Sequence, residues 1–322
     1  MLCCGFFLAG CKDGNEKNDE DTNPGTQSST TISLSEAKTI IVNALALDED
    51  SSSAEQQGNR DLFEKFGMVQ LNSLTETQDY TTSEMISQEE YVGHYEYSNN
   101  SIQKYLSSMS STAVENDEIT EVNYQEYSSD YITVYRNIED ELFGNMVMEI
   151  TLSNDESTGE SFEIETLESQ ILSITNVMFT DDAFDAVYKE NVARNKTDDG
   201  FSLTLSSDYK GFIRLLNLEL MTDDEFDTFW PLFSYGYNSM PQELKDIEKF
   251  EFVLNFDETE QITSLEMSLK YGEESVVWGD SSENESISYD IQTMNTTISK
   301  YAGEITEPQW VTDYLANKDS SN

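Results

Sequence analysis

Alternation of apolar and polar residues is the feature of this chain that most constrains its fold. Successive side chains of a β-strand point to opposite faces of a sheet, so a strand with one buried face repeats every two residues. The apolar positions that follow this period are Tyr91, Gly93, Tyr95 and Tyr97; Met146, Met148, Ile150 and Leu152; Phe201, Leu203 and Leu205; Phe250, Phe252, Leu254 and Phe256; Leu265, Met267, Leu269 and Tyr271; and Ile287, Tyr289 and Ile291. Such segments are typical of sheets that bury one face and wet the other. The pattern predicts a large antiparallel sheet.

Two turns between these segments can be located. Asp257-Glu258-Thr259-Glu260 separates the alternating residues 250–256 and 262–271, and this arrangement predicts a β-hairpin. Asp198-Asp199-Gly200 predicts the turn that leads into the strand beginning at residue 201. A calcium-binding loop is the alternative for this second turn, but Ser206 occupies the position that should hold the closing Glu.

Helices are predicted where capping residues precede a helical repeat. Ser33 and Glu36 form a capping box. The apolar residues that share one face of this helix are Leu34, Ala37, Ile40, Ile41, Ala44 and Leu45. Residues 180–185 and 222–227 each place a Thr before acidic residues that favour the positive end of a helix dipole; an acidic metal cluster is the alternative. Residues 62–74 and 101–109 fit either a helix or a strand. Together these signals predict an α+β fold.

The N-terminal segment resembles a bacterial lipoprotein signal. Residues 2–10 are apolar and uncharged, and Leu8-Ala9-Gly10 precedes Cys11 as in a lipobox. Small residues admit the signal peptidase, and the thiol accepts a diacylglyceryl group. No Lys or Arg precedes Cys11, although a signal peptide needs a cationic start, so we expect the natural translation start to lie upstream of Met1. A chance meeting of an apolar N-terminus with a Cys is the alternative.

The chain divides into four predicted parts. Residues 1–10 are the signal peptide, residues 11–32 the lipidated Cys and a disordered acidic tether, residues 33–316 a single α+β domain, and residues 317–322 a frayed tail. The tether is polar and acidic and cannot bury a core. We therefore expect a protein anchored by a lipid on Cys11 to the outer face of a bacterial membrane, at the cell surface or in the periplasm.

The chain is strongly acidic, with 64 Asp and Glu against 17 Lys and Arg and a net charge of −47. Nucleic acids and anionic lipid surfaces would be repelled, because both are bound through Lys and Arg. Solubility explains the charge, and weak association of divalent cations is the functional alternative. Aromatic residues make up 11% of the chain, whereas disordered proteins are poor in them, so we predict an aromatic-rich core inside an acidic shell.

Residues that commonly carry catalysis are scarce. The only histidine is His94, on the strand face opposite the neighbouring tyrosines, and the last of the three cysteines is Cys11. A zinc site with several His ligands and a Cys nucleophile in the body are therefore excluded, and no phosphate-loop, dinucleotide or hydrolase motif occurs. We predict a non-enzymatic protein with no catalytic residue, no cofactor and no metal site. A hydrolase that uses paired carboxylates remains open, because acidic neighbours are common here by chance.

Aromatic residues are the remaining candidates for a binding site. They come from the most apolar short segment of the body, residues 229–233, and from one face of the strand at 250–256. The residues predicted to line a cavity are Phe229, Trp230, Phe233, Phe250, Phe252 and Phe256. Ordinary core packing is the alternative for all of them.

The order of these features along the chain resembles that of the outer-membrane lipoprotein carrier and of the LppX-type bacterial lipoproteins. The resemblance is carried by the lipobox and polar tether, the capped helix from Ser33, the order of sheet and helices, the hairpin at 250–271, the strand at 287–291 and Lys300-Tyr301-Ala302-Gly303-Glu304-Ile305-Thr306-Glu307-Pro308. Related lipoproteins close on a Tyr-Gly-Glu-Pro-like segment; here Ala302 intrudes and Pro308 comes late. The order of elements matches over residues 33–312, and the residues themselves only over the last quarter of the chain.

The resemblance implies a curved antiparallel half-barrel with helices packed on its concave side, around a cavity for a lipid or other hydrophobic ligand. The favoured hypothesis is therefore an anchored, non-enzymatic lipoprotein that binds such a ligand. A structural or adhesin-like surface module without a cavity is the second hypothesis. A secreted carboxylate hydrolase is the third.

Overall fold

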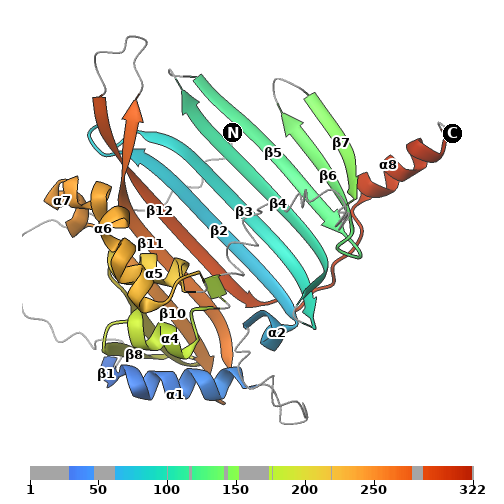
Figure 1. Cartoon of the computed structure of the whole chain (residues 1–322). Helices are drawn as coiled ribbons and strands as arrows, with labels where there is room; N and C mark the ends of the chain where they lie inside the picture. The colour runs from blue at the N-terminus through green and yellow to red at the C-terminus, as the bar shows by residue number, and fades with distance from the viewer. Residues whose placement is uncertain are drawn as a thin grey trace, which may run out of the picture.

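Twelve strands form one antiparallel sheet in the described part of the chain (Figure 1). The computed structural model describes residues 29–46, 62–99, 101–115, 118–140, 144–151, 174–175, 177–218, 220–277 and 286–320. The strands are β1 (Ser29–Ser33), β2 (Met68–Asp79), β3 (Met85–Ser98), β4 (Ser101–Glu115), β5 (Glu118–Ser128), β6 (Thr133–Asp140), β7 (Gly144–Thr151), β8 (Asn191–Thr197), β9 (Gly200–Ser206), β10 (Lys249–Asp257), β11 (Ile262–Val277) and β12 (Ser286–Lys300). Their order is β1-β8-β9-β10-β11-β12-β2-β3-β4-β5-β6-β7, so the sheet is open and its edges are β1 and β7.

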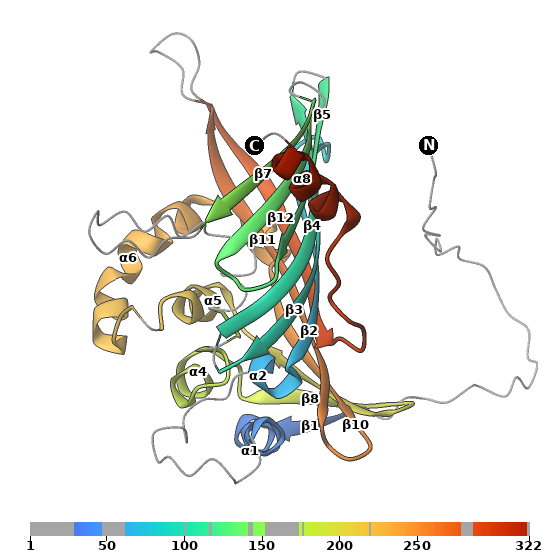
Figure 2. The same ribbon diagram turned by 90° about the vertical axis from the view of Figure 1, so that its right-hand side faces the viewer.

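Helices cover part of this sheet. They are α1 (Leu34–Leu45), α2 (Leu62–Phe66), α4 (Asp181–Ala186), α5 (Tyr209–Leu216), α6 (Asp223–Ser239), α7 (Gln242–Asp246) and α8 (Gln309–Ser320). Figure 2, which shows the sheet nearly edge-on, places α1, α4, α5 and α6 on the same side of it. These helices lie over the half of the sheet that contains β8 to β11 (Figure 1).

The predicted antiparallel sheet is confirmed. Every second side chain of β10 is buried, as the alternation requires. The predicted hairpin consists of β10 and β11, which place Leu254 opposite Leu265. Its turn is stabilised by Asp257, whose Oδ1 accepts hydrogen bonds from the backbone N–H groups of Thr259 at 2.8 Å and Gln261 at 3.0 Å. The local turn chemistry therefore sets the register of the hairpin.

The helix-start predictions are confirmed at α1, α4 and α6. The Oγ of Ser33 accepts a hydrogen bond from the backbone N–H of Glu36 at 3.2 Å. Thr180 caps α4 in the same way. Thr222 and Glu225 form a reciprocal capping box at the start of α6. The acidic residues of these segments therefore act as helix-start residues, since they lie in the first turns of α4 and α6.

The two segments that fitted either a helix or a strand now have defined structures. Residues 62–74 begin as α2 and continue as β2, and the two elements are separated by Gly67. Its φ of +68° lies in the left-handed region, which favours glycine after a helix. Residues 101–109 belong to β4. The turn predicted at 198–200 joins β8 to β9, where Thr197 pairs with Gly200.

The sheet carries an apolar cluster on each face. The larger cluster contains Val69 and Tyr105 together with residues of α1, α2, α4 and α5. The smaller cluster contains Tyr127 and Val311, with Leu106 packed against them. Tyr105 and Leu106 are consecutive in β4 and point to opposite faces. Helix α8 therefore lies on the face opposite the other helices of the core, which departs from the expectation that all helices share one side.

The chain has regular structure on both sides of the predicted boundaries at 33 and 316. Strand β1 begins at Ser29, so residues 29–32 pair with β8 instead of belonging to the tether. Helix α8 continues to Ser320, into the segment expected to fray. Both segments are rich in polar residues. The edge strand β1 is held by backbone pairing, and α8 packs on one side only, so neither needs many apolar side chains. The predicted signal peptide, Cys11 and the rest of the tether lie outside the described residues.

Candidate ligand-binding site

Aromatic side chains from α5, α6, β10 and β11 gather on one face of the sheet. Tyr209 of α5 and Tyr237 of α6 stack with their ring centroids 4.1 Å apart and their planes 4° apart. Phe212 of α5 stacks on Phe250 of β10 at 4.8 Å, and Tyr271 of β11 lies 6.2 Å from Phe250. Offset and stacked rings at these distances attract one another beyond the burial of their area. The rings therefore join two helices to the β10–β11 hairpin.

The sequence of α5 explains how it presents these rings. Asp208 caps the helix, and its Oδ1 accepts a hydrogen bond from the backbone N–H of Gly211 at 2.8 Å. The apolar and aromatic residues of one helix face then follow at positions i, i+3, i+4 and i+7. They are Tyr209, Phe212, Ile213 and Leu216. All four line the same pocket.

This aromatic pocket has a volume of about 320 Å³, between α5, α6 and β11. It is lined by Tyr209, Phe212, Ile213, Leu216, Tyr237, Met240, Tyr271, Gly272, Glu273 and Glu274. A Cβ on Gly272 would lie only 3.2 Å from the side chain of Leu244 in α7, so the glycine permits close approach of α7 to β11. A mostly apolar wall with a few polar groups is the usual form of a small-molecule site.

The phenols of the aromatic pocket remain uncharged at neutral pH. Burial raises the pKa of Tyr209, and the carboxylates of Glu248 and Glu273 raise it further. Burial, followed by the charge of Glu273, has the same effect on the pKa of Tyr271. Burial and then the charge of Glu248 raise the pKa of Tyr237 to about 12. The three tyrosines can therefore donate hydrogen bonds through neutral hydroxyl groups.

Glu248 lies at the hydroxyl end of Tyr237, one of the two stacked tyrosines. Its Oε2 accepts a hydrogen bond from the hydroxyl of Tyr237 at 3.1 Å. Its Oε1 is buried and has no hydrogen-bond partner in the described part of the chain. Burial raises the pKa of Glu248, against the opposing effects of the Tyr237 hydrogen bond and of Lys245. The carboxyl group is thus only partly satisfied, and an additional donor would stabilise its ionised form.

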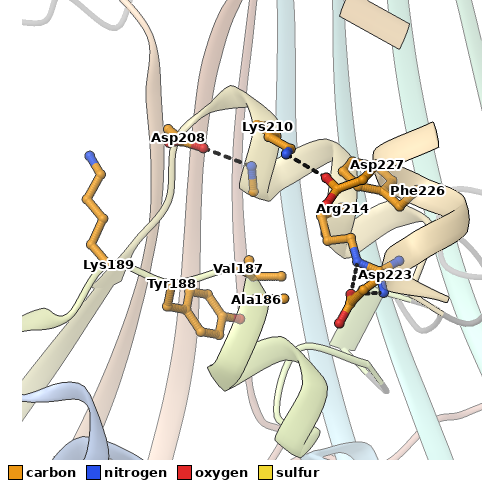
Figure 3. Close-up of a pocket in the computed structure, with 11 residues that line it drawn as sticks. Ala186, Val187, Tyr188, Lys189, Asp208, Lys210, Arg214, Asp223, Phe226 and Asp227 are labelled. Carbon is orange, nitrogen blue, oxygen red and sulfur yellow. Dashed lines mark hydrogen bonds and ion pairs between the residues drawn. The ribbon is translucent and has the colours of Figure 1, made fainter. Parts of the chain in front are cut away.

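A second pocket of about 450 Å³ lies beside α5, toward the start of α6 and the residues before β8 (Figure 3). Two of its three lining cations are paired within the protein: Lys210 Nζ lies 2.8 Å from Asp227 Oδ1, and Arg214 Nε donates to Asp223 Oδ1 at 3.0 Å. Lys189 extends away from both pairs in Figure 3. Because α5 and α6 supply opposite members of each pair, this pocket is best explained as a junction that joins the two helices.

The residues predicted to line a cavity are divided between core and surface. Phe252 and Phe256 are buried in the main core, where Phe256 stacks on Phe201 at 4.7 Å. Phe250 is also buried, and it supports the aromatic pocket from behind through Phe212. None of these three lines either of the two pockets.

The apolar segment of α6 lies at the surface instead. Phe229 is 44% exposed, whereas Trp230 is half-buried and its ring centroid lies 6.2 Å from that of Tyr209. The side chain of Phe233 lies outside the described residues, as do Cys11 and Leu8-Ala9-Gly10. Of the predicted residues whose side chains the structure describes, Trp230 and Phe250 contact the rings of the aromatic pocket.

Sequence reasoning missed the residues that line the pocket. Tyr271 belongs to a predicted strand, and the helical spacing of Tyr209 with Phe212 after the Asp208 cap was an available signal. Tyr237 carried no such signal, because it lies at the far end of α6 and meets Tyr209 only through the packing of the two helices.

His94 lies in β3, on the face that also carries α8. Its ring stacks on Tyr301 with centroids 4.1 Å apart, and burial lowers its pKa. A packed, neutral strand histidine matches these contacts. Among the described residues, no group of three or more His, Cys, Asp or Glu side chains is placed to hold a metal ion.

Within the described ranges, no helix is both long enough and apolar enough to cross a membrane. No protein-family model and no curated protein matches the chain. Two solved structures are similar at low TM-score. A DUF1329 family protein from Desulfovibrio piger has a TM-score of 0.24 and 4% identity, over 84% of this chain and 95% of that one. A porin-like protein from Bacteroides uniformis has a TM-score of 0.18 and 10% identity, over 73% of this chain and 98% of that one. Neither likeness is strong enough to support an argument about this chain.

Proposed function

We propose that this chain is a non-enzymatic binding protein that holds a hydrophobic ligand in the aromatic pocket. The observation that carries the proposal is the pocket itself, about 320 Å³ in volume and walled by Tyr209, Tyr237 and Tyr271. This volume lies within the range of small-molecule sites, which begins at roughly 300 Å³. Neutral phenols give the ligand both an apolar ring surface and hydrogen-bond donors.

The proposal includes an anchor at the outer face of a bacterial membrane. Cys11 would carry the lipid, after cleavage of a signal that ends in Leu8-Ala9-Gly10. The acidic surface would keep the domain soluble and apart from nucleic acids, and divalent cations would associate with it weakly. In this arrangement the membrane is the partner that locates the protein, and the pocket performs the binding.

We also propose that the sheet is the scaffold of a half-barrel, as the resemblance to LppX-type lipoproteins implies. The helices that build the larger core would then cover its concave side, and the aromatic pocket would be the opening between two of them. The packing of α5 against the sheet through Phe212 and Phe250 supports this arrangement.

Ligand binding can be tested with two leucines, one in the lining of the pocket and one outside it. Leu216 lines the aromatic pocket, whereas Leu220 is exposed just beyond α5 and is not part of its lining. The full chain with Cys11→Ser would be titrated with the uncharged fluorescent probe N-phenylnaphthylamine. Leu216→Gln should weaken binding about tenfold, because roughly 1.5 kcal/mol of apolar contact is lost. Leu220→Gln should leave the affinity unchanged.

Organic extraction and mass spectrometry of the same purified protein provide an independent measurement. A co-purified apolar compound that is depleted by Leu216→Gln would support the proposal. Absence of both probe uptake and extractable ligand would overturn it, as would equal effects of the two leucine substitutions.

A surface interaction module without a ligand is the second candidate. It is favoured by three apolar side chains that α6 exposes to solvent: Phe229 at 44%, Leu232 at 71% and Tyr235 at 80%. Exposed apolar patches commonly mark protein contacts. A protein that binds no probe but loses self-association or partner binding on Leu232→Ser would support this alternative.

A further inference from the structure

The charges around the aromatic pocket define what kind of hydrophobic ligand it would accept. We propose that the ligand is an organic cation, with an apolar body against the tyrosine rings and an ammonium group facing the carboxylates at the rim. This inference rests on the proposed function and adds the chemical class of the ligand. It follows from the side chains that surround the pocket.

The charged residues that line the pocket are both acidic. Glu273 and Glu274 follow Tyr271 and Gly272 on β11 and belong to the lining. Glu273 is exposed to solvent, and Glu274 is half-buried with its Oε2 accepting a hydrogen bond from Ser239 Oγ at 3.3 Å. The described lining contains no Lys or Arg. An ammonium group at this rim would meet carboxylates without competition from a lining cation.

Glu248 adds a third carboxylate beside the hydroxyl of Tyr237. It contacts the pocket through the hydroxyl of Tyr237, and its Oε1 lacks a hydrogen-bond partner among the described residues. The charges of Glu248 and Glu273 both raise the pKa of Tyr209 after the effect of burial. At the stacked phenols these two carboxylates favour a cation over an anion, and Lys245 offsets part of the charge of Glu248.

The tyrosine rings themselves can bind a cation. The negative face of an aromatic ring attracts an ammonium group within roughly 6 Å of its centroid. The ring of Tyr237 already binds a cation, because Lys245 Nζ lies 5.0 Å from its centroid. The same ring also stacks on Tyr209. Lys245 also donates to the backbone oxygen of Asn238 at 3.3 Å, so it is held outside the lining. The rings of Tyr209 and Tyr271 remain part of the lining.

The charge of the whole chain acts in the same direction. A net charge of −47 raises the local concentration of cations and lowers that of anions. Fatty acids and other anionic amphiphiles would therefore be poor ligands, even though their chains match the apolar wall. Nonspecific attraction to the acidic surface would act on any cation, whether or not it fits the pocket.

The test compares three probes with the same alkyl chain and different head groups. Octyltrimethylammonium, octanol and octyl sulfate would be titrated by calorimetry into the full chain with Cys11→Ser. We expect the cation to bind at least about tenfold more tightly than octanol, because ring and carboxylate contacts add to apolar burial, and we expect octyl sulfate not to bind.

Two charge-neutralising variants separate the pocket from the surface. Glu273→Gln should weaken binding of the cation about fivefold and leave the affinity for octanol unchanged. Glu258→Gln removes the same charge from the exposed turn between β10 and β11, outside the pocket lining, and should change neither probe. If the two variants weaken binding of the cation equally, the attraction comes from the acidic surface and not from the pocket, and the inference is overturned.

The remaining outcomes distinguish this inference from the proposed function. If octanol and the cation bind equally well and Leu216→Gln weakens both, the pocket binds hydrophobic ligands but does not select cations, so only the inference fails. If none of the three probes binds, the proposed function and the inference fail together.

Discussion

At the scale of single residues, Glu248 is a carboxyl group whose environment raises its pKa. Burial raises its pKa above the ordinary range of a carboxyl, and the hydrogen bond from Tyr237 and the charge of Lys245 only partly oppose this. A folded-state pKa above the unfolded-state value means that the folded protein holds the proton more tightly. The protonated form of Glu248 therefore stabilises the fold relative to the ionised form.

The corresponding prediction compares the wild type with Glu248→Gln. The contribution of Glu248 is fully present below its unfolded-state pKa of about 4.3 and is lost as the pH rises through the raised folded-state pKa. As the pH rises from the unfolded-state value through the raised folded-state pKa, the wild type should therefore lose stability relative to Glu248→Gln, as measured by urea denaturation. Glu243→Gln, at an exposed position of α7, is the matched control. Parallel stability profiles for the wild type and Glu248→Gln would contradict the prediction.

At the scale of elements, α8 packs on the face opposite the main core. Val311 is fully buried there, in the cluster that also contains Tyr127 and Ile305. The end of the helix is linked to β7, since Lys318 Nζ lies 2.7 Å from Glu149 Oε2. Because that ion pair is at the surface, the apolar contact of Val311 should hold the helix more strongly.

This difference can be measured with two substitutions that each add one carboxylate to α8. Val311→Asp should lower the free energy of unfolding by about 3 kcal/mol, because it buries a charge without a partner. Ala316→Asp, at an exposed position of the same helix, should change it by no more than about 0.5 kcal/mol. Comparable losses would show that α8 does not pack on the sheet as described. If Val311→Asp prevents folding, Val311→Ala provides a milder form of the same measurement.

The predictability of an element depended on how local its signals are. The β10–β11 hairpin and α1 could be predicted, because alternation, turn residues and the Ser33 cap all act within a few residues. The polar end of α8 and the pairing of β1 could not, because their partners are distant in sequence. The same holds for the candidate site. The rings of α5 had a readable helical period, whereas the stacking of Tyr237 depends on how two helices meet.

At the scale of the whole molecule, the pairing of β12 with β2 joins the two halves of the sheet (Figure 1). The side chains of Ser73 and Thr296 meet across this seam, with their hydroxyl oxygens 2.8 Å apart. Both residues are buried, at 4% and 2% exposure. A hydroxyl buried at this depth must find its partner within the protein, so the bond favours the native register over a shifted one.

A double-mutant cycle on this pair tests the role of the seam. Ser73→Ala or Thr296→Val alone should cost about 1–3 kcal/mol of unfolding free energy, because each leaves the other hydroxyl buried without its partner. The double variant should cost less than the sum, with a coupling energy of about 1 kcal/mol in urea denaturation. Thr77 and Gln292 form a hydrogen bond of the same length between the same strands but are only partly buried. Water can replace a lost partner at that second pair, so its coupling should be smaller. Additive costs at residues 73 and 296 would mean that the seam is held by backbone pairing and apolar contacts alone.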